Sequence, residues 1–272
     1  MADIHNIQAI DVHAHYGRYW RHGFPELSNR LATGDAVTVA QRARVSNVEW
    51  TVVSPLLGLF PRGEAITEDG NTEAQREVLK TPGLLQWVII DPTRPVTYDQ
   101  ARDMLAMPQC VGIKIHPEEH IYPIREHGRA IFEFAAQHEA IMLTHSGHEN
   151  SLPADFVPFA NDFPAVKLIL AHLGCSGGSD RSLQVRALQQ SKHGNMYVDT
   201  SSAQSIWPGL IEWAVAETGV ERILFGTDTP LYSVPMQRAR IDYAELCDKD
   251  KRRILRDNAA TLLGLTDTRT TS

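Results

Sequence analysis

The sequence predicts a single-domain (β/α)8 TIM barrel, the α/β fold in which eight parallel strands are each followed by a helix. Short apolar, β-branched runs alternate with amphipathic stretches along the 272 residues, and eight such units fill a barrel of ~250 residues. Near-continuous apolar runs, such as KLILA at 167–171, indicate a parallel sheet covered by helices. An open doubly wound sheet is the alternative, but no glycine-rich dinucleotide loop follows the first strand.

The predicted elements follow one another in strict alternation. Strands are expected at Ala9–His15, Trp50–Pro55, Leu84–Asp91, Cys110–His116, Ile141–His145, Val166–His172, Asn195–Thr200 and Arg222–Asp228. Helices are expected between them at Asp35–Ser46, Asn71–Lys80, Tyr98–Met107, Gly128–His138, Arg181–Lys192 and Trp207–Thr218. We expect one domain over residues 1–272, with the barrel core at about 8–264 and a frayed tail at 266–272.

The composition excludes several other classes of protein. The net charge of −7 argues against nucleic acid or an anionic membrane as a partner, and no apolar run reaches the ~18 residues of a membrane span. Cys110, Cys175 and Cys247 lack the spacing of a disulfide framework or a thiolate zinc site, which favours a reducing cytoplasm. We therefore expect a cytoplasmic protein with a small-molecule substrate. Trp207 and Trp213 on one predicted helix are compatible with a homodimer.

Residue types that bind metals recur at the ends of the predicted strands. Active sites of (β/α)8 barrels lie at the carboxyl ends of their strands, so these side chains are expected to meet in one bowl. Successive side chains of a strand alternate between its faces, so His13 and His15 point the same way. Imidazole and carboxylate groups bind divalent ions such as zinc, so the sequence predicts a metal enzyme. The strand-end residues are His13, His15, Lys114, His116, His145, His172 and Asp228.

Six segments, each at a predicted strand, follow one another along the chain: DVHAHYG, VGIKIHP, IMLTHSGH, LILAHLG, NMYVDTS and ILFGTDTP. In this order they resemble the amidohydrolase superfamily, and within it the amidohydrolase-related (amidohydrolase 2) branch of metal-dependent hydrolases and decarboxylases. The resemblance implies that His13, His15, His145 and Asp228 bind a catalytic divalent ion. It also implies that His172 hydrogen-bonds the metal-bound water, or binds a second metal in binuclear members.

These residue types predict hydrolysis by an activated water. A divalent ion held by imidazoles and a carboxylate lowers the pKa of its bound water from about 15.7 toward about 7. Asp228 would accept the proton of this water and deliver it to the leaving group, while His172 orients the water or the substrate oxygen. We therefore expect a metal-dependent hydrolase of a small-molecule amide, lactone or ester, with Asp228 and His172 catalytic. Zinc is the expected ion, although manganese, iron and cobalt accept the same ligands.

Lys114 and His116 lie on one face of the fourth predicted strand, and we expect both to bind substrate. Two other roles stay open for Lys114. It can be a carbamate that bridges two metals, as in binuclear amidohydrolases, or it can pair with a buried carboxylate such as Asp11. His116 either contacts substrate or forms a structural hydrogen bond in the bowl. Asp11 itself is expected to support the site from below.

The main alternative activity is non-oxidative decarboxylation of an unsaturated or aromatic carboxylic acid, because relatives with this histidine pattern catalyse it. An arginine would then bind the carboxylate, and Arg18, Arg21 and Arg62 lie in loops after the first two strands. Arg18 is the expected substrate-binding residue. Aromatic residues that can wall the substrate are Tyr16, Trp20 and Phe60. Decarboxylases of this type usually have longer insertions between early strands, which favours the hydrolase.

Two further alternatives make different predictions. A barrel without catalysis would act as a binding protein, and replacing Asp228 would then leave any turnover unchanged. A metal-independent lactonase would keep its activity after thorough chelation. No expected ligand position is vacant in this sequence, which favours a metal-dependent enzyme over both.

Overall fold

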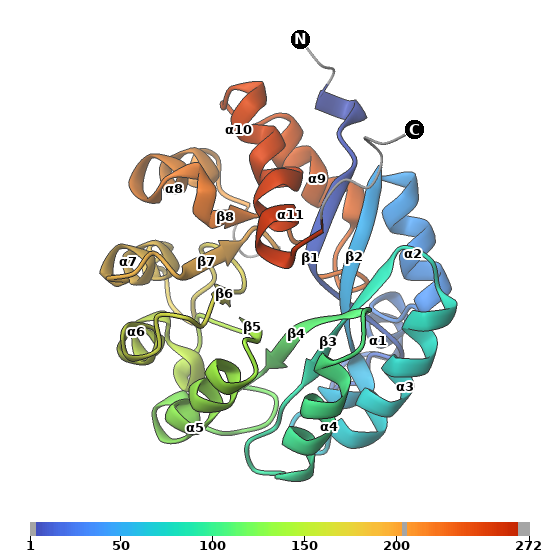
Figure 1. Ribbon diagram of the computed structural model, residues 1–272. Coiled ribbons are helices and arrows are strands. Elements are labelled where there is room, and N and C mark those ends of the chain that lie inside the picture. Colours follow the sequence, from blue (N-terminus) through green and yellow to red (C-terminus); the bar gives the residue numbers. More distant parts are fainter. Residues whose placement is uncertain (1–3, 203–205, 266–272) are drawn as a thin grey trace.

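The computed structural model describes residues 4–202 and 206–265 and has the predicted barrel architecture (Figure 1). Eight parallel strands form one sheet in the order β1 to β8, so each strand pairs with the next one along the chain. The strands are β1 (Ala9–Tyr16), β2 (Val48–Pro55), β3 (Leu84–Ile89), β4 (Cys110–Ile115), β5 (Ile141–Thr144), β6 (Leu168–Leu170), β7 (Met196–Asp199) and β8 (Ile223–Leu224).

Backbone hydrogen bonds between β1 and the segment after β8 bring the two edges of the sheet together. The His13 carbonyl accepts from the amides of Thr227 (3.2 Å) and Asp228 (2.7 Å). The buried carboxylate of Asp11 strengthens this seam, because it accepts from the His13 amide and from the amide and hydroxyl of Thr227. Burial raises the pKa of Asp11 to about 8. Strand β1 and the segment after β8, which carry the predicted ligands His13, His15 and Asp228, are therefore fixed to each other directly.

Helices surround the sheet on its outer side (Figure 1). They include α1 (Glu26–Leu31), α2 (Ala36–Val45), α3 (Thr67–Lys80), α4 (Val96–Leu105), α5 (Ile124–Gln137), α6 (Pro153–Asp162), α7 (Leu183–Gln190), α8 (Leu210–Thr218), α9 (Val234–Asp242), α10 (Asp248–Arg252) and α11 (Asn258–Leu263). The six predicted helices are present as α2, α3, α4, α5, α7 and α8. Helices α1, α6, α9, α10 and α11 were not predicted from the sequence. Helix α6 contains Pro158, a residue that normally interrupts helical patterns.

Two of the four apolar clusters among the described residues hold the sheet together with its helices. The larger one packs the outward faces of the strands, such as Ile113 and Ile115 of β4, against helices that include α5. The other joins strand residues from β1, β2, β3, β5, β6 and β8 around the fully buried Trp87, whose indole nitrogen donates to the Val12 carbonyl at 2.8 Å. Side chains therefore fill the barrel beneath the site, as is usual for this fold.

Strands β3 to β8 all end before the residues predicted for their ends, and in β6 and β8 the early end precedes a predicted site residue. β6 ends at Leu170 and β8 at Leu224, whereas strands were expected to continue to His172 and Asp228. His172 (φ 70°) and Asp228 (φ 58°) adopt left-handed backbone conformations, which end the extended geometry. Non-glycine residues rarely adopt this conformation, and it recurs at functional sites. These turns aim both side chains into the mouth of the barrel.

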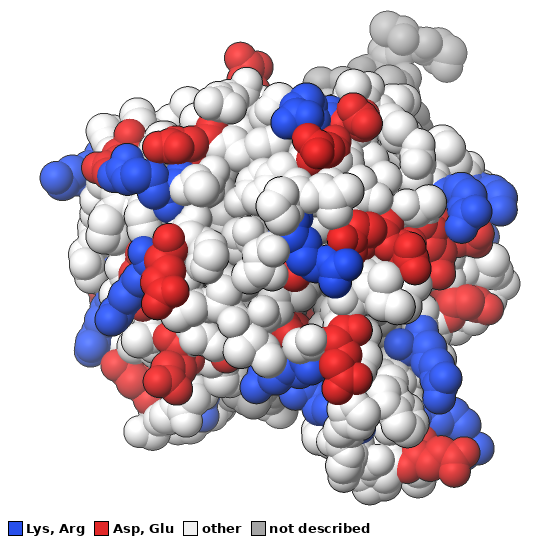
Figure 2. Space-filling view, turned by 90° about the horizontal axis from the view of Figure 1, so that it is seen from below, with Lys and Arg blue, Asp and Glu red and all other residues white. Residues whose placement is uncertain are grey.

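The surface and the ends of the chain bear on the remaining predictions. On the face shown in Figure 2, acidic and basic side chains are interspersed. None of the helices in the described part of the chain is long and apolar enough to cross a membrane. The tail predicted at 266–272 lies outside the described residues. The cytoplasmic location, the homodimer and the absence of a nucleic-acid partner stay predictions.

Candidate metal centre

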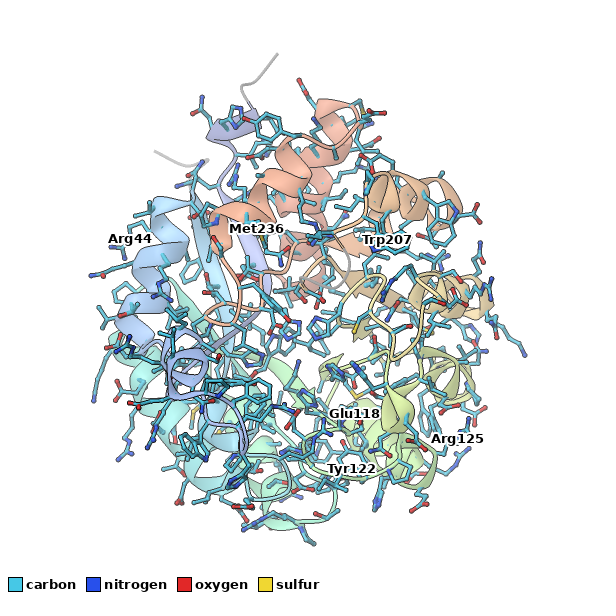
Figure 3. The ribbon with its side chains drawn as sticks, turned by 180° about the vertical axis from the view of Figure 1, so that it is seen from behind. Arg44, Glu118, Tyr122, Arg125, Trp207 and Met236 are labelled. Carbon is cyan, nitrogen blue, oxygen red and sulfur yellow. The ribbon has the colours of Figure 1, made fainter. Side chains whose placement is uncertain are left out.

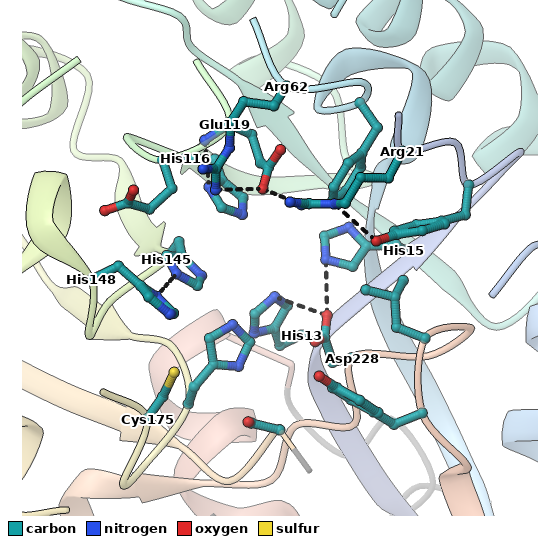
Figure 4. Close-up of a pocket in the computed structure, with 17 residues that line it drawn as sticks. His13, His15, Arg21, Arg62, His116, Glu119, His145, His148, Cys175 and Asp228 are labelled. Carbon is teal, nitrogen blue, oxygen red and sulfur yellow. Dashed lines mark hydrogen bonds and ion pairs between the residues drawn. The ribbon is translucent and has the colours of Figure 1, made fainter. Parts of the chain in front are cut away.

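Three side chains at the barrel mouth form a compact group of metal-ligating atoms (Figure 4). Asp228 Oδ1 lies 3.1 Å from His15 Nε2 and 3.7 Å from His13 Nε2. All three residues are buried, and one ligand atom from each lies within 4.8 Å of the others. Two imidazole nitrogens and a carboxylate oxygen facing one point are a donor set that suits zinc, manganese and related divalent ions.

Hydrogen bonds behind the rings support this donor set. His13 Nδ1 lies 2.8 Å from Asp199 Oδ2, and because a carboxylate only accepts, Nδ1 carries the proton and Nε2 the lone pair. His15 Nδ1 lies 3.1 Å from the Ser54 carbonyl and 3.0 Å from its hydroxyl. Ser54 can therefore satisfy either tautomer of His15, including the one with its Nε2 lone pair free. Such bonds to the second ring nitrogen orient metal-binding histidines in other proteins.

Burial and neighbouring groups set the protonation states that metal binding requires. Burial, aided by the nearby Lys114 charge, lowers the pKa of His13 to about 3, so this imidazole is neutral at neutral pH. Burial alone would raise the pKa of Asp228, but the hydrogen bond with His15 and the surrounding histidines lower it to about 2. The site therefore holds a neutral imidazole beside an ionised carboxylate, which are the forms that coordinate metal ions.

Asp199, at the end of β7, holds His13 and the neighbouring loop in place. Its Oδ1 accepts from the amides of His172 and Ser201, both at 3.0 Å, and from the Ser201 hydroxyl at 2.5 Å. Burial opposes ionisation, but His13, His172 and Ser201 hold the pKa of this carboxyl well below its usual range. Asp199 also forms a compact group with His13 and His172. Because both carboxylate oxygens of Asp199 already accept hydrogen bonds from neighbouring groups, we assign Asp199 a supporting role.

Replacing Asp199 with asparagine is expected to weaken metal binding by about 10–100-fold, because partners of ligating histidines tune affinity to this extent. The amide cannot reproduce the charged acceptor of His13 Nδ1–H. Metal titration of the purified variant would measure the change. Asp91→Asn is a matched control, since Asp91 is a buried strand-end carboxylate bonded to Thr93, outside the ligand group. Equal dissociation constants for Asp199→Asn and the unmodified protein would contradict this role.

His145, the remaining predicted metal ligand, lies in the same bowl but outside the compact ligand group. Its Nε2 is 2.8 Å from His148 Nδ1. Its ring stacks on His116 with the centroids 4.4 Å apart, and lies 5.0 Å from the ring of His172. The described structure thus brings His13, His15 and Asp228 together as predicted, while coordination by His145 stays a prediction. His148 was not identified from the sequence as a site residue.

Lys114 lies beneath the ligand group and not at the substrate surface. Its ammonium group is almost fully buried and lies 3.0 Å from His13 Nε2, to which it donates. Burial lowers the pKa of Lys114 to about 8 although Asp199 and Asp228 oppose the shift. This placement does not support the predicted substrate contact, because the side chain does not line the cavity.

A cavity of about 250 Å³ opens over the ligand group. This volume is near the lower end of the range for small-molecule sites, about 300–1,000 Å³, and suits a small substrate. His116, His145 and His172 line the cavity as predicted.

In the view of Figure 3, Glu118 lies toward the middle of the molecule, whereas Arg44 and Arg125 point outward at its edge. Glu118 is buried and accepts from the Asn150 amide at 2.7 Å, which fixes the loop after β5.

Two arginines face the cavity from its rim, but Arg18 is not one of them. Arg21 and Arg62 both donate to Glu119 Oε1, at 2.5 and 3.3 Å, and all three residues line the cavity (Figure 4). Arg18 is exposed, and its guanidinium lies 5.2 Å from the centre of the Trp20 ring. The prediction that Arg18 binds substrate is therefore not supported, because its loop turns this side chain outward.

The aromatic walls also differ from the prediction. Phe60 lines the cavity as expected, together with Tyr19 and Tyr232. Tyr16 is buried among the residues that pack β1 against α2 and α3, and Trp20 is partly exposed. Tyr16 lies one position after His15 on β1 and therefore on the opposite face, a signal that strand alternation already contained.

The comparisons with known proteins identify the family. The sequence matches the amidohydrolase family over residues 10–265, so the chain belongs to this family, as the ordered segments suggested. The family match makes the chain an enzyme of the amidohydrolase superfamily, and the ligand group described above supports a divalent-metal site in it. No curated protein sequence matches the chain significantly.

Solved structures with the same fold cover nearly the whole chain. A 5-carboxyvanillate decarboxylase from Sphingomonas paucimobilis is 12% identical with a TM-score of 0.70, covering 96% of this chain and 100% of the other. A dihydroxybenzoic acid decarboxylase from Polaromonas sp. JS666, with bound manganese and 2-nitroresorcinol, is 14% identical (TM-score 0.71; 94% and 97%). A protein designated as a 2-pyrone-4,6-dicarboxylic acid hydrolase from Pseudomonas putida is 17% identical (TM-score 0.66; 95% and 98%). At these identities the likeness shows the shared fold.

Proposed function

We propose that the protein is a metal-dependent decarboxylase of a small aromatic or unsaturated carboxylic acid. One observation carries the proposal: the same cavity is lined by the candidate metal ligands, by Arg21 and Arg62, and by the aromatic side chains of Tyr19, Phe60 and Tyr232. Guanidinium groups bind carboxylates with two parallel hydrogen bonds, and aromatic walls favour planar rings. The sequence alone favoured hydrolysis. The decarboxylases among the structural neighbours support the alternative better.

Decarboxylation replaces the carboxylate of the substrate with a single proton. The bond between the carboxyl carbon and the ring carbon breaks, its electron pair stays on the ring carbon, and a proton replaces the released carbon dioxide. A divalent ion in the site would supply the charge that holds and polarises the substrate oxygens. We assign the transfer of this proton to Asp228. Because its low pKa keeps it ionised, it first takes a proton from water or from a substrate hydroxyl and then delivers it to carbon.

The ligands that we infer for the ion are His13, His15, Asp228 and, as a fourth, His145. Zinc is the ion that these ligands predict from their chemistry, and the manganese in the Polaromonas decarboxylase supports manganese as well. Elemental analysis of the purified protein distinguishes the two. His172 lines the cavity close to His13, with ring centroids 4.8 Å apart, and we infer that it orients a substrate oxygen.

A product assay tests the proposal. Protein loaded with zinc or manganese is incubated with hydroxybenzoic acids, including 2,6-dihydroxybenzoate and 5-carboxyvanillate, and released carbon dioxide is measured together with the decarboxylated ring. We expect release with at least one hydroxylated aromatic acid. If no acid in a broad panel releases carbon dioxide while a lactone or amide is hydrolysed, the decarboxylase proposal fails.

Hydrolysis is the second candidate, and one structural observation favours it. The carboxylate of Asp228 and the ring of His172 both face the cavity, which is the pair that water attack on a carbonyl needs. The Pseudomonas putida neighbour, designated a lactone-type dicarboxylic acid hydrolase, is consistent with this reading. An assay of 2-pyrone-4,6-dicarboxylate tests hydrolysis directly, because opening of its ring can be monitored as a loss of ultraviolet absorbance.

Replacing Arg62 with alanine is expected to raise KM for the acid by about 10–100-fold with a smaller change in kcat, because a charged hydrogen bond is worth about 1.5–3 kcal/mol. Arg62 is the more exposed of the two rim arginines, with 47% of its side chain accessible, so its removal leaves Arg21 paired with Glu119. Arg18→Ala is the matched control from the neighbouring loop. Steady-state kinetics that gave the two variants equal KM values would contradict a carboxylate site at Arg62.

A further inference from the structure

Ser201, two residues after β7 ends, has a buried hydroxyl at the centre of the site's hydrogen bonds. Its side chain is fully buried. Its Oγ lies 2.5 Å from Asp199 Oδ1, 2.8 Å from His172 Nδ1 and 3.1 Å from His13 Nδ1. The hydroxyl thus contacts the carboxylate that supports the metal-binding histidine and the ring that faces the substrate cavity.

The number of hydrogens decides which atoms donate. Asp199 is ionised and can only accept, so the short contact with Ser201 requires the serine O–H to point at Asp199 Oδ1. A serine hydroxyl has one hydrogen, so its oxygen can only accept from His172. His172 Nδ1 must therefore carry a proton. A neutral histidine has one ring N–H, which leaves the lone pair on Nε2.

We propose that Ser201 is a positioning residue that fixes the tautomer of His172, so that Nε2 faces the substrate as a hydrogen-bond acceptor. His172 lines the cavity, and its other nitrogen is held behind it by Ser201. The group that meets Nε2 is then a donor, such as a substrate hydroxyl or a water. The inference rests on the proposed function only in assigning substrate contact to His172.

The tautomer can be measured without substrate. Protein labelled with ¹⁵N at histidine, metal-free or loaded with diamagnetic zinc, is studied by long-range proton–nitrogen NMR correlation, and His172→Gln identifies the signals of His172. In the unmodified protein we expect Nδ1 to show the chemical shift of a protonated nitrogen and Nε2 that of a lone-pair nitrogen. In Ser201→Ala we expect His172 to lose this tautomer, with the proton moving from Nδ1 to Nε2. Ser201→Thr, which restores a hydroxyl, is expected to restore the original pattern.

Matched controls separate this effect from general damage. Ser191→Ala removes another buried serine hydroxyl, bonded to Asn195 away from the site, and is expected to leave the His172 signals unchanged. Protonation of Nε2 in the unmodified protein would overturn the proposal, even if Ser201→Ala does not fold. An unchanged tautomer in a folded Ser201→Ala variant would also overturn it. Because no substrate is present, failure of the decarboxylation assay leaves this result intact.

Discussion

Replacing Asp228 with asparagine is expected to lower kcat by about 10³-fold, the middle of the range for removing a proton-transfer group. The amide keeps the size of the side chain and one acceptor oxygen, but it cannot take and release the proton. Turnover of the acid identified by the product assay, measured at saturating metal, gives the effect on chemistry separately from the effect on metal affinity.

The control for Asp228→Asn is that the backbone hydrogen bonds between β1 and the segment after β8 stay intact. The Asp228 amide donates to the His13 carbonyl through the backbone, so the substitution leaves this bond in place. Metal-saturated Asp228→Asn protein with an unchanged Tm and a kcat within about threefold of the unmodified enzyme would show that another group moves the proton. This outcome would also favour a barrel whose ligand group has only a binding role.

Removing the metal is expected to abolish turnover while leaving the barrel folded. The ligand group lies at the mouth, whereas the apolar clusters and the strand pairing that stabilise the fold lie around and beneath it. Dialysis against a chelator, followed by activity and circular dichroism measurements, tests both parts. Zinc or manganese added back is expected to restore turnover. Full activity in thoroughly stripped protein would instead support the metal-independent lactonase.

The barrel itself could be predicted because its signal is repeated along the whole chain. Each strand is an apolar run followed by an amphipathic stretch, so an error at one element leaves the others in place. The ends of β6 and β8 could not be predicted in this way. There the left-handed conformations of His172 and Asp228 depend on tertiary hydrogen bonds, such as the bond from the His172 amide to Asp199.

The site could be predicted only in part, for a related reason. His13, His15 and Asp228 end strands, and strand ends of a barrel converge whatever the loops do. Arg18 and Arg62 lie in loops, whose course the strand pattern does not determine, and only Arg62 reaches the cavity. Asp199 could have been identified as a site residue from the sequence, because it is a carboxylate at the end of a predicted strand.

The metal content of the unmodified protein and of His13→Ala tests the proposed metal centre directly. Both are purified without a metal-affinity column from cells supplied with zinc and manganese, with His193→Ala, an exposed histidine, as the control. We expect one divalent ion per chain in the unmodified protein and the control, and its loss in His13→Ala. An unmodified protein without metal, or a His13→Ala variant that keeps its metal fully, would show that His13, His15 and Asp228 do not form a metal centre.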